Sequence, residues 1–270
     1  MQPEVAIFPT ARGLLPGRER RLDSGMLATD AEQGMNEFEL TGRARTHVVE
    51  LEQPRCTLHY AAVAAFLAMR DAAACAGIGL EAASSFRDFD RQLRIWNAKW
   101  SGERPLLDDG GRPLDAAALD DHERIAAILH WSALPGGSRH HWGSDVDVID
   151  AAALPEGYRV QLVAEEYAPG GVFARLTPWL DANMGRFGFY RPYASGLGGA
   201  GIEAWHLSYW PVATEALEAL TLPVLRRAII GSDLLGKERV LERLPEIYTR
   251  FIVAVDSSAR AARLAASRGA

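Results

Sequence analysis

The densest group of metal-ligating residue types lies in the stretch SRHHWGSDVD, residues 138–147. A second group, EAWH, places a carboxylate close to an imidazole. A catalytic zinc ion takes three protein ligands from histidine nitrogens and carboxylate oxygens, and it keeps a fourth position open for water. His140, Asp147 and His206 supply such a set, which would leave Glu203 as a free carboxylate near the bound water.

These residue types predict hydrolysis by a metal-activated water. A bound metal would lower the pKa of its water from about 15.7 towards 7 and polarise the substrate carbonyl. Glu203 would take the proton from this water and return it to the leaving amine. Residues three apart in an extended strand face opposite sides, so we expect Glu203 in a turn or at the first residue of a strand.

The other histidines fit ordinary structural roles better than a metal site. His141 follows His140 directly and is expected to point the other way, as a structural or peripheral residue. A lone Glu-x-x-His is also common on helix and turn surfaces. From residue types alone, the combined set of His140, Asp147, Glu203 and His206 therefore fits a metal site and ordinary structural roles equally well. The histidines interpreted as surface or hydrogen-bonded core residues are His47, His59, His122 and His130.

The stretch GLGGAG at residues 196–201 matches Gly-x-Gly-x-x-Gly, the fingerprint of dinucleotide-binding proteins. That fingerprint needs a preceding strand, a following helix and an acidic residue about 20 positions further on. Here the strand that carries EAWH follows at once. The stretch is therefore interpreted as a flexible loop beside the active site, without a cofactor role.

The composition is that of an ordinary globular protein, with 48% hydrophobic and 24% charged residues among 270. Lys and Arg number 29 and Asp and Glu number 35, and the net charge of −6 disfavours a general nucleic-acid-binding surface. Cys56 and Cys75 are too few for a disulfide framework or a four-cysteine zinc site. They are interpreted as free thiols rather than as one bridge.

The sequence offers no membrane span and no visible secretory signal. No stretch approaches the roughly 18 consecutive apolar residues that a span requires. The N-terminal stretch MQPEVAIFPTARGLLPGRERR lacks a basic start followed by a long apolar run. We expect a cytoplasmic protein by default, or a periplasmic one if a leader is missing from this chain.

The elements that must position these residues predict an α+β fold, because strands and helices do not alternate regularly. A strand or an extended segment is predicted around 46–49, and strands are predicted at about 78–83, 145–149, 187–190 and 205–210, with a long loop at 101–118. Helices are predicted at about 57–76, 88–100 and 120–131, in a short segment with Thr177 as N-cap, Pro178 at its first position and Gly185 beyond its end, and over most of 214–266.

Three blocks of the chain, in order, resemble the VanY-type zinc D-alanyl-D-alanine carboxypeptidases of peptidase family M15. One block is Ser-x-His-x-x-Gly-x-x-x-Asp, which begins at Ser138, and the next is Glu-x-Trp-His, which begins at Glu203. The third, SSFRDFDRQ at residues 84–92, is similar to the family's Ser-Gly-Tyr/Phe-Arg-x-x-x-x-Gln segment. Together the blocks cover roughly residues 55–211.

The resemblance implies a role for each matching residue. His140, Asp147 and His206 would bind Zn²⁺, and Glu203 would be the catalytic base. Arg87 would contact the developing oxyanion or a substrate carboxylate, which suits a planar and permanently charged donor. The residues that would hold the terminal residue of the peptide are Ser138 and Gln92, while Trp205 would pack beside the metal.

The resemblance also implies a fold and a substrate. The fold would be a small antiparallel sheet with packed helices, as in hedgehog-type and D,D-peptidase domains. Outside the motifs, the Pro- and Gly-containing composition of residues 1–36 predicts an N-terminal arm, and the helical pattern of residues 212–270 predicts a C-terminal extension packed on the zinc peptidase domain at 37–211. The partner would be a peptidoglycan-derived peptide ending in D-Ala-D-Ala, with no nucleic acid and an unknown oligomeric state.

One departure from the family pattern concerns Asp145, which stands where the family has a small residue. Asp145 and Asp147 share a strand face, so either carboxylate could reach the metal. The register of the motif favours Asp147. Asp145 would then support a ligand or tune substrate preference.

Two other functions stay open at this level. One keeps the zinc but cuts inside the stem peptide, as a peptidoglycan endopeptidase of the same superfamily. The other is a zinc-containing binding module without catalysis, against which the presence of Glu203 and Arg87 argues. Dipeptidase and carboxypeptidase preferences are not separated, because the depth of the pocket decides between them.

Overall fold

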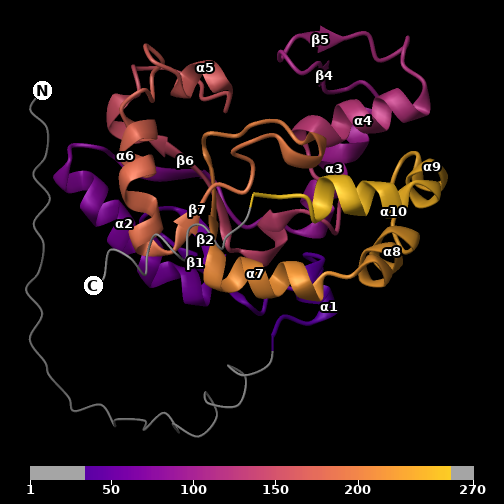
Figure 1. The fold of residues 1–270 in the computed structure, drawn as a ribbon, viewed down its shortest axis with the longest axis horizontal. Helices are drawn as coiled ribbons and strands as arrows, with labels where there is room; N and C mark the ends of the chain where they lie inside the picture. Colours follow the sequence, from indigo (N-terminus) through magenta and orange to yellow (C-terminus); the bar gives the residue numbers. More distant parts are fainter. Residues whose placement is uncertain (1–33, 257–270) are drawn as a thin grey trace, which may run out of the picture. The chain divides into compact units, whose positions relative to one another are not determined.

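The computed structural model describes residues 34–256, whose helices and strands are shown in Figure 1. The α-helices are α1 (Glu37–Leu40), α2 (Val63–Cys75), α3 (Phe89–Trp100), α4 (Asp121–Trp131), α5 (Ala164–Tyr167), α6 (Leu176–Asn183), α7 (Trp210–Ala219), α8 (Leu222–Ile230), α9 (Lys237–Glu242) and α10 (Leu244–Ile247). The strands are β1 (Val48–Leu51), β2 (Cys56–His59), β3 (Leu80–Ser84), β4 (Leu106–Leu107), β5 (Pro113–Leu114), β6 (Asp145–Asp150), β7 (Phe189–Tyr190) and β8 (His206–Tyr209).

The central sheet is antiparallel, with the strand order β3-β6-β8-β7. Its two middle strands place Asp147 of β6 opposite His206 of β8. On the other edge of β6, a register shift between Ala82 and Ser84 in β3 pairs Ser84 with Asp147. The predicted α+β fold with a small antiparallel sheet is therefore confirmed, and its register brings two motif residues together.

Two hydrophobic cores flank the site. One core joins Trp96 of α3 to side chains of the C-terminal helices such as Leu225. The other joins Phe66 of α2 to Val146 of β6. In Figure 1, α2 and α6 lie to one side of the sheet, and α3, α4, α8, α9 and α10 lie to the other. Trp142 belongs to the first core, so the chain crosses from one core to the other just before β6.

Helices α3 and α4 lie where the sequence predicts them, because an aspartate caps each one. The Asp88 carboxylate accepts a hydrogen bond from the Arg91 amide at 2.7 Å. At the start of α4, the Asp120 carboxylate accepts from the Glu123 amide, and the Glu123 carboxylate accepts from the Asp120 amide. Such caps satisfy amides that the first helical turn leaves without partners.

The prediction of a helix from residue 57 is wrong over its first turns. Residues 56–59 form β2, whose Thr57 and Leu58 pair with Glu50 and Val49 of β1. The helix α2 starts only at Val63, after a 3-10 turn at Tyr60–Ala62. Pairing with a neighbouring strand decides the structure of this short segment over its local preference.

Two further local predictions need correction. The predicted loop at 101–118 contains the small hairpin β4–β5, whose turn is held by the Asp108 carboxylate, which accepts from the Gly110 and Arg112 amides. Helix α6 starts at Leu176, so Thr177 is not its N-cap. The Thr177 hydroxyl donates instead to the Tyr167 carbonyl at 2.9 Å.

The C-terminal segment is helical, as predicted, up to the π-helical turn at Tyr248–Ile252. Within residues 34–256, no helix combines the length and apolar character needed to cross a membrane. Residues 257–266 of the predicted helical tail and residues 1–33 of the predicted arm lie outside the described residues. The domain boundaries at 36 and 211 stay predictions. Cys56 is buried and Cys75 exposed, and both are free thiols, as predicted.

The β1–β2 hairpin supports the segment that carries His140. The His59 amide donates to the Gly143 carbonyl at 2.8 Å. Gly143 has a φ of +66°, and a Cβ at this position would lie 2.6 Å from the His59 nitrogen. The backbone of the hairpin therefore approaches too closely for any side chain at Gly143.

The buried His59 gives the fold a testable dependence on pH. Burial, together with a smaller effect of the neighbouring His47, lowers the pKa of His59 to about 4. Because this value lies below the unfolded-state value, the stabilisation is present above about pH 6.5 and is lost as the pH falls towards 4. We expect His59 to cost the metal-free chain about 2 kcal/mol of unfolding free energy between pH 7 and pH 5.

Urea denaturation at the two pH values measures this loss. His59→Asn keeps an acceptor for the Ala61 amide, which donates to His59 Nδ1 at 3.2 Å, and should remove this part of the pH dependence. His122→Asn, at an exposed position of α4, is the matched control and should leave it unchanged. The same pH dependence in His59→Asn and the unaltered chain would contradict the assignment.

Candidate active site

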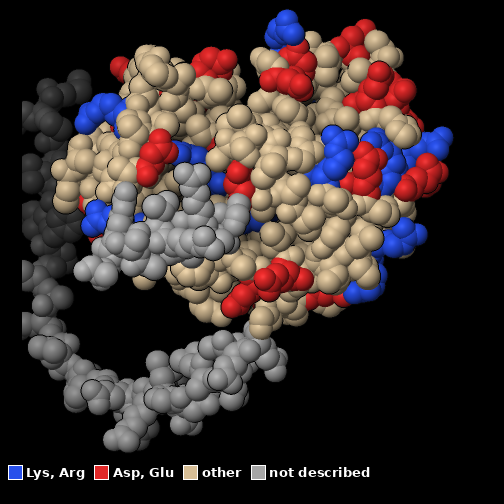
Figure 2. All heavy atoms as spheres, viewed as in Figure 1, with Lys and Arg blue, Asp and Glu red and all other residues tan. Residues whose placement is uncertain are grey.

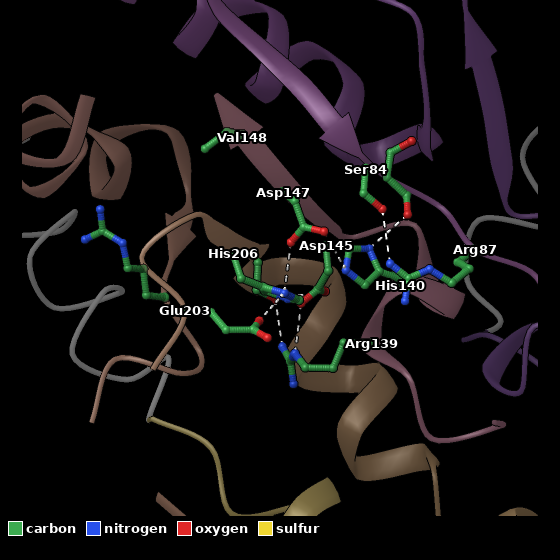
Figure 3. A network of polar contacts seen from close by, with 12 residues as sticks. Ser84, Arg87, Arg139, His140, Asp145, Asp147, Val148, Glu203 and His206 are labelled. Atoms are coloured by element: carbon green, nitrogen blue, oxygen red, sulfur yellow. Dashed lines mark hydrogen bonds and ion pairs between the residues drawn. The ribbon is translucent and has the colours of Figure 1, made fainter. Parts of the chain in front are cut away.

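His140, Asp147 and His206 come together at one point of the molecule. Each offers one ligand atom, and these atoms lie within 4.8 Å of one another. His140 comes from the 3-10 turn at Arg139–Trp142, and the other two come from β6 and β8. All three side chains are buried. Figure 3 shows His140, Asp147 and Glu203 gathered around the His206 ring.

Each histidine is held through its other ring nitrogen. Nδ1 of His140 lies 2.9 Å from the Ser85 carbonyl, and Nε2 of His206 lies 2.9 Å from Oδ1 of Asp145. This leaves Nε2 of His140 and Nδ1 of His206 facing Asp147, at 3.4 and 3.3 Å from its carboxylate oxygens. Metal-ligating histidines are commonly oriented in this way by a carbonyl or carboxylate.

The charges and hydrogen bonds of the site fit a bound divalent cation. Oδ1 of Asp147 is buried without a hydrogen bond of normal geometry. Burial alone would lower the pKa of His206, but contacts with Asp145, Asp147 and Glu203 raise it well above its ordinary value. The three carboxylates therefore favour a positive charge at this point. A cation with nitrogen and oxygen ligands would supply that charge and replace the proton on His206.

Asp145 is fully committed to contacts inside the protein. Its carboxylate accepts from Arg139 Nε at 2.9 Å and from the Ser208 hydroxyl at 3.0 Å. Burial would raise the pKa of Asp145, but the Arg139 guanidinium and His206 outweigh it and hold that pKa well below its usual range. Asp145 thus lies behind His206, on the side away from Asp147, and orients the ring. The prediction that Asp147 is the metal ligand is consistent with this placement.

Glu203 lies where the sequence argument requires it. It precedes β8, separated from it by a turn at residues 204–205. Its Oε2 lies 3.1 Å from Nδ1 of His206, and its amide donates to the Tyr193 carbonyl at 3.1 Å. Unlike the buried ligands, the Glu203 side chain is 19% exposed. It can therefore meet a water and a substrate in the cleft.

Arg87 is held in position by two neighbours. One guanidinium nitrogen donates to Gln92 Oε1 at 2.7 Å, and another donates to the Ser84 hydroxyl at 3.2 Å. Nε2 of Gln92 donates to the Ala133 carbonyl at 2.7 Å, and the Gln92 side chain is completely buried. Both ends of this amide are thus engaged, and Gln92 supports Arg87. A direct contact of Gln92 with the substrate stays a prediction.

Ser138 is placed as expected for a residue that meets substrate. Its hydroxyl is buried and has no hydrogen-bond partner within residues 34–256. Ser138 also lines the cleft that contains the three candidate ligands. The hydroxyl is therefore available to a group that enters the cleft.

His141 points away from the ligands, as predicted. Its Nε2 accepts from the Gly136 amide at 3.0 Å, so Nδ1 carries the proton and donates to the Arg87 carbonyl at 2.6 Å. Burial lowers the pKa of His141 to about 3 and keeps the ring neutral. Across the described part of the chain, no other group of histidine, cysteine and acidic residues has metal-binding geometry.

Sequence reasoning missed several residues that build the site. Arg139 is buried and paired with Asp145, although the motif gives its position no role. Tyr193 packs edge-on against His206, with ring centroids 5.0 Å apart, and burial raises the pKa of Tyr193 to about 12. The Ser85 carbonyl is a backbone group, so no residue type could indicate it.

The site opens into a cleft of about 720 Å³. One wall is formed by residues 161–165, and the opposite wall includes Leu107 and residues 109–111 around the β4–β5 hairpin. Figure 2 shows a notch in the surface between these two regions. Ala200 of the glycine-rich stretch also lines the cleft, which confirms that this stretch lies beside the site.

The two rims of the cleft are held differently. Leu162 has a φ of +56°, an uncommon conformation for a residue with a side chain. The buried Glu166 carboxylate fixes this rim by accepting from the Gln161 and Leu162 amides. The opposite rim is fixed by Trp131 Nε1, which donates to the Asp108 carbonyl at 3.0 Å.

Comparison with known proteins gives two relatives by sequence. Two proteins of Haemophilus influenzae, both described as uncharacterized, are 49% identical over 98 residues and 35% identical over 122 residues. The first match covers 35% of this chain and 67% of the relative, and the second covers 44% and 93%.

Three solved structures are similar in fold. The vancomycin-resistance D,D-pentapeptidase VanY in complex with Zn(II) has 24% identity and a TM-score of 0.44, covering 62% of this chain and 82% of that one. VanYB in complex with D-alanine-D-alanine has 21% identity and a TM-score of 0.44, covering 69% and 89%. The LD-carboxypeptidase LdcB has 22% identity and a TM-score of 0.43, covering 68% and 78%.

A sequence profile provides the family. The profile described as VanY, D-alanyl-D-alanine carboxypeptidase, matches residues 55–212, which contain all three motif blocks. This match extends over more than half of the 270 residues. The chain therefore belongs to the VanY D-alanyl-D-alanine carboxypeptidase family.

Proposed function

We propose that the protein is a zinc-dependent peptidase that hydrolyses the terminal D-Ala-D-Ala bond of peptidoglycan-type peptides. The observation that carries this proposal is the convergence of His140, Asp147 and His206 beside the partly exposed Glu203 in one cleft. Membership of the VanY family supports the substrate class. The two histidines and one carboxylate match the ligand types of catalytic zinc sites.

The residues of the chain divide the chemistry among them. A zinc ion held by His140, Asp147 and His206 would polarise the scissile carbonyl and lower the pKa of a water towards about 7. Glu203 accepts the proton of the attacking water and delivers it to the amine of the departing D-alanine. Asp145 and the Ser85 carbonyl keep the two imidazoles in the tautomers that face Asp147.

Arg87 meets the negative charge that develops on the substrate. Burial lowers the pKa of its guanidinium, while the Asp147 and Glu203 charges oppose that shift, and the group stays protonated. Its anchoring by Gln92 and Ser84 fixes the donors before the reaction, so little reorganisation is needed in the transition state. The unpartnered Ser138 hydroxyl hydrogen-bonds the terminal residue of the peptide.

The test combines metal content with product analysis. The protein is loaded with zinc, and bound zinc is counted after removal of the excess. It is then incubated with a muramyl-type peptide that ends in D-Ala-D-Ala. We expect one zinc per chain and release of free D-alanine, and no release from the metal-free protein.

Other products would support the other functions. Fragments from bonds inside the stem peptide would indicate an endopeptidase, and intact D-Ala-D-Ala as the only product would indicate a different cleavage position. Bound zinc with no cleavage of this peptide or of longer stem peptides would favour a binding module.

A further inference from the structure

A group of cations lies in the cleft apart from the candidate ligands. Lys99 near the end of α3, Arg104 beyond it and Arg87 before it all line the cleft. The Lys99 ammonium donates to the Ser132 hydroxyl at 2.7 Å, and Ser132 lines the cleft as well. Within residues 34–256, neither Lys99 nor Arg104 forms an ion pair with a carboxylate.

The surroundings of Lys99 are electrostatically unfavourable for a lysine. Burial lowers the pKa of Lys99 to about 8, and repulsion by Arg104 and Arg87 contributes, while Glu203 acts in the opposite direction. Lys99 is half-buried, and a partly desolvated charge without a counter-charge is unfavourable, so proteins usually pair such groups. An anion bound between Lys99 and Arg104 would supply the missing partner.

The acidic residues of the cleft do not fill that role. Asp147 and Glu203 contact His206. Asp109, on the hairpin rim, has a side chain that is 95% exposed and lies 3.8 Å from Nδ1 of His130. Glu165 belongs to the opposite wall. Within residues 34–256, therefore, no carboxylate pairs with Lys99, and its charge is available to a negative group of a molecule in the cleft.

Gln92 and Arg87 are the other side chains that could bind a substrate carboxylate, and the protein already engages both of them. Gln92 is completely buried, both ends of its amide are engaged, and it does not line the cleft. Two of the five N–H groups of the Arg87 guanidinium are likewise donated to protein acceptors. Within residues 34–256, only Ser132 accepts from the Lys99 ammonium, which leaves two of its three N–H groups for a ligand.

We propose that Lys99, seated on Ser132 and flanked by Arg104, binds a carboxylate of the substrate peptide. This inference rests on the proposed function in taking a peptide as the ligand. Two carboxylates of such a peptide share the required chemistry, namely the free C-terminal group and an acidic side chain upstream. Binding of the C-terminal group would make the enzyme an exopeptidase, because an internal bond leaves no such charge beside the cut.

The experiment measures binding separately from cleavage. Calorimetry in the zinc-loaded Glu203→Gln background compares three synthetic pentapeptides that end in D-Ala-D-Ala. The first has a free C-terminus and one upstream acidic residue, the second has a C-terminal amide, and the third has its upstream acid replaced by an amide. Each is tested with Lys99 intact and with Lys99→Met, which keeps the apolar length but removes the charge.

We expect Lys99→Met to weaken binding of the first peptide by about tenfold to a hundredfold, the usual value of a hydrogen bond to a charged group. One of the two amidated peptides should bind weakly even with Lys99 intact, and Lys99→Met should not weaken its binding further. The carboxylate that this peptide lacks is the one that Lys99 binds. Lys99→Arg should restore much of the affinity, and Ser132→Ala should lose a few-fold through poorer positioning.

A matched control uses Lys237, the other lysine of the chain. Its ammonium donates to the Ser232 carbonyl at 2.8 Å, and it lies outside the cleft lining. Lys237→Met should leave all three affinities unchanged. Equal binding of all three peptides with Lys99 intact, or the same preference in Lys99→Met, would overturn the inference. A Lys99-dependent difference in affinity between the three peptides, without any hydrolysis by the unaltered protein, would support the inference. It would overturn only the proposed function.

Discussion

Replacing Glu203 by glutamine is expected to lower the rate of D-alanine release by about 10²–10⁴-fold, the usual contribution of a general base. Glutamine has nearly the same shape but cannot accept the proton of the attacking water. Glu203 is not one of the three convergent ligands, so zinc should stay bound with an unchanged stoichiometry. Single-turnover assays of D-alanine release and a count of bound zinc measure the two quantities.

The matched control is Glu165→Gln, an acidic residue on the cleft wall that contacts none of the candidate ligands. It should release D-alanine at a rate close to that of the unaltered protein. Full activity in Glu203→Gln would refute the assignment of the base. Loss of zinc together with activity would instead make Glu203 a ligand.

Replacing Asp147 by asparagine is expected to weaken zinc binding on the order of 10³-fold or more, because a charged ligand is lost. Asp145→Asn is its natural comparison, since both aspartates lie on β6 and both contact His206. Asp145 acts only through the His206 ring, so its replacement should cost about 10–100-fold in zinc affinity. Titration of zinc against a competing chelator gives both values.

Stability provides the second half of this comparison. Asp145→Asn leaves the buried Arg139 without its carboxylate, and an unpaired buried charge costs about 3–5 kcal/mol. Asp147→Asn removes a carboxylate from the crowded group around His206, so it should destabilise the metal-free chain less. Thermal unfolding of the two metal-free variants checks this order. Loss of zinc only in Asp145→Asn would exchange the roles of the two aspartates.

The sequence was sufficient for the residues that act through their own chemistry. His140, Asp147 and His206 could be proposed as ligands because few residue types bind metals and because the resemblance to a family motif favoured them, and the same motif register favoured Asp147 over Asp145. The position of Glu203 before β8 followed from strand geometry alone. Helices α3 and α4 were predicted from the helical spacing of their apolar residues, and the caps at Asp88 and Asp120 are what the structure adds.

The parts that could not be predicted depend on contacts between distant segments. The strand β2 is formed by its pairing with β1, a contact that its own four residues do not specify. The role of Arg139 depends on Asp145 and Ser208, and the latter lies 69 residues further along the chain. Gln92 has a motif match to a substrate residue, yet it is absent from the cleft lining, and its amide is hydrogen-bonded to Arg87 and to the Ala133 carbonyl.

The position of the site between the two hydrophobic cores has a consequence for how the chain can be shortened. More than half of the buried members of the core around Trp96 come from residues after 212, beyond the end of the family match. A chain that stopped there would keep every motif residue but would expose Trp142, two positions after His140. We therefore expect a chain cut at residue 212 to keep the residues of the site but to lose much of the core that stabilises their arrangement.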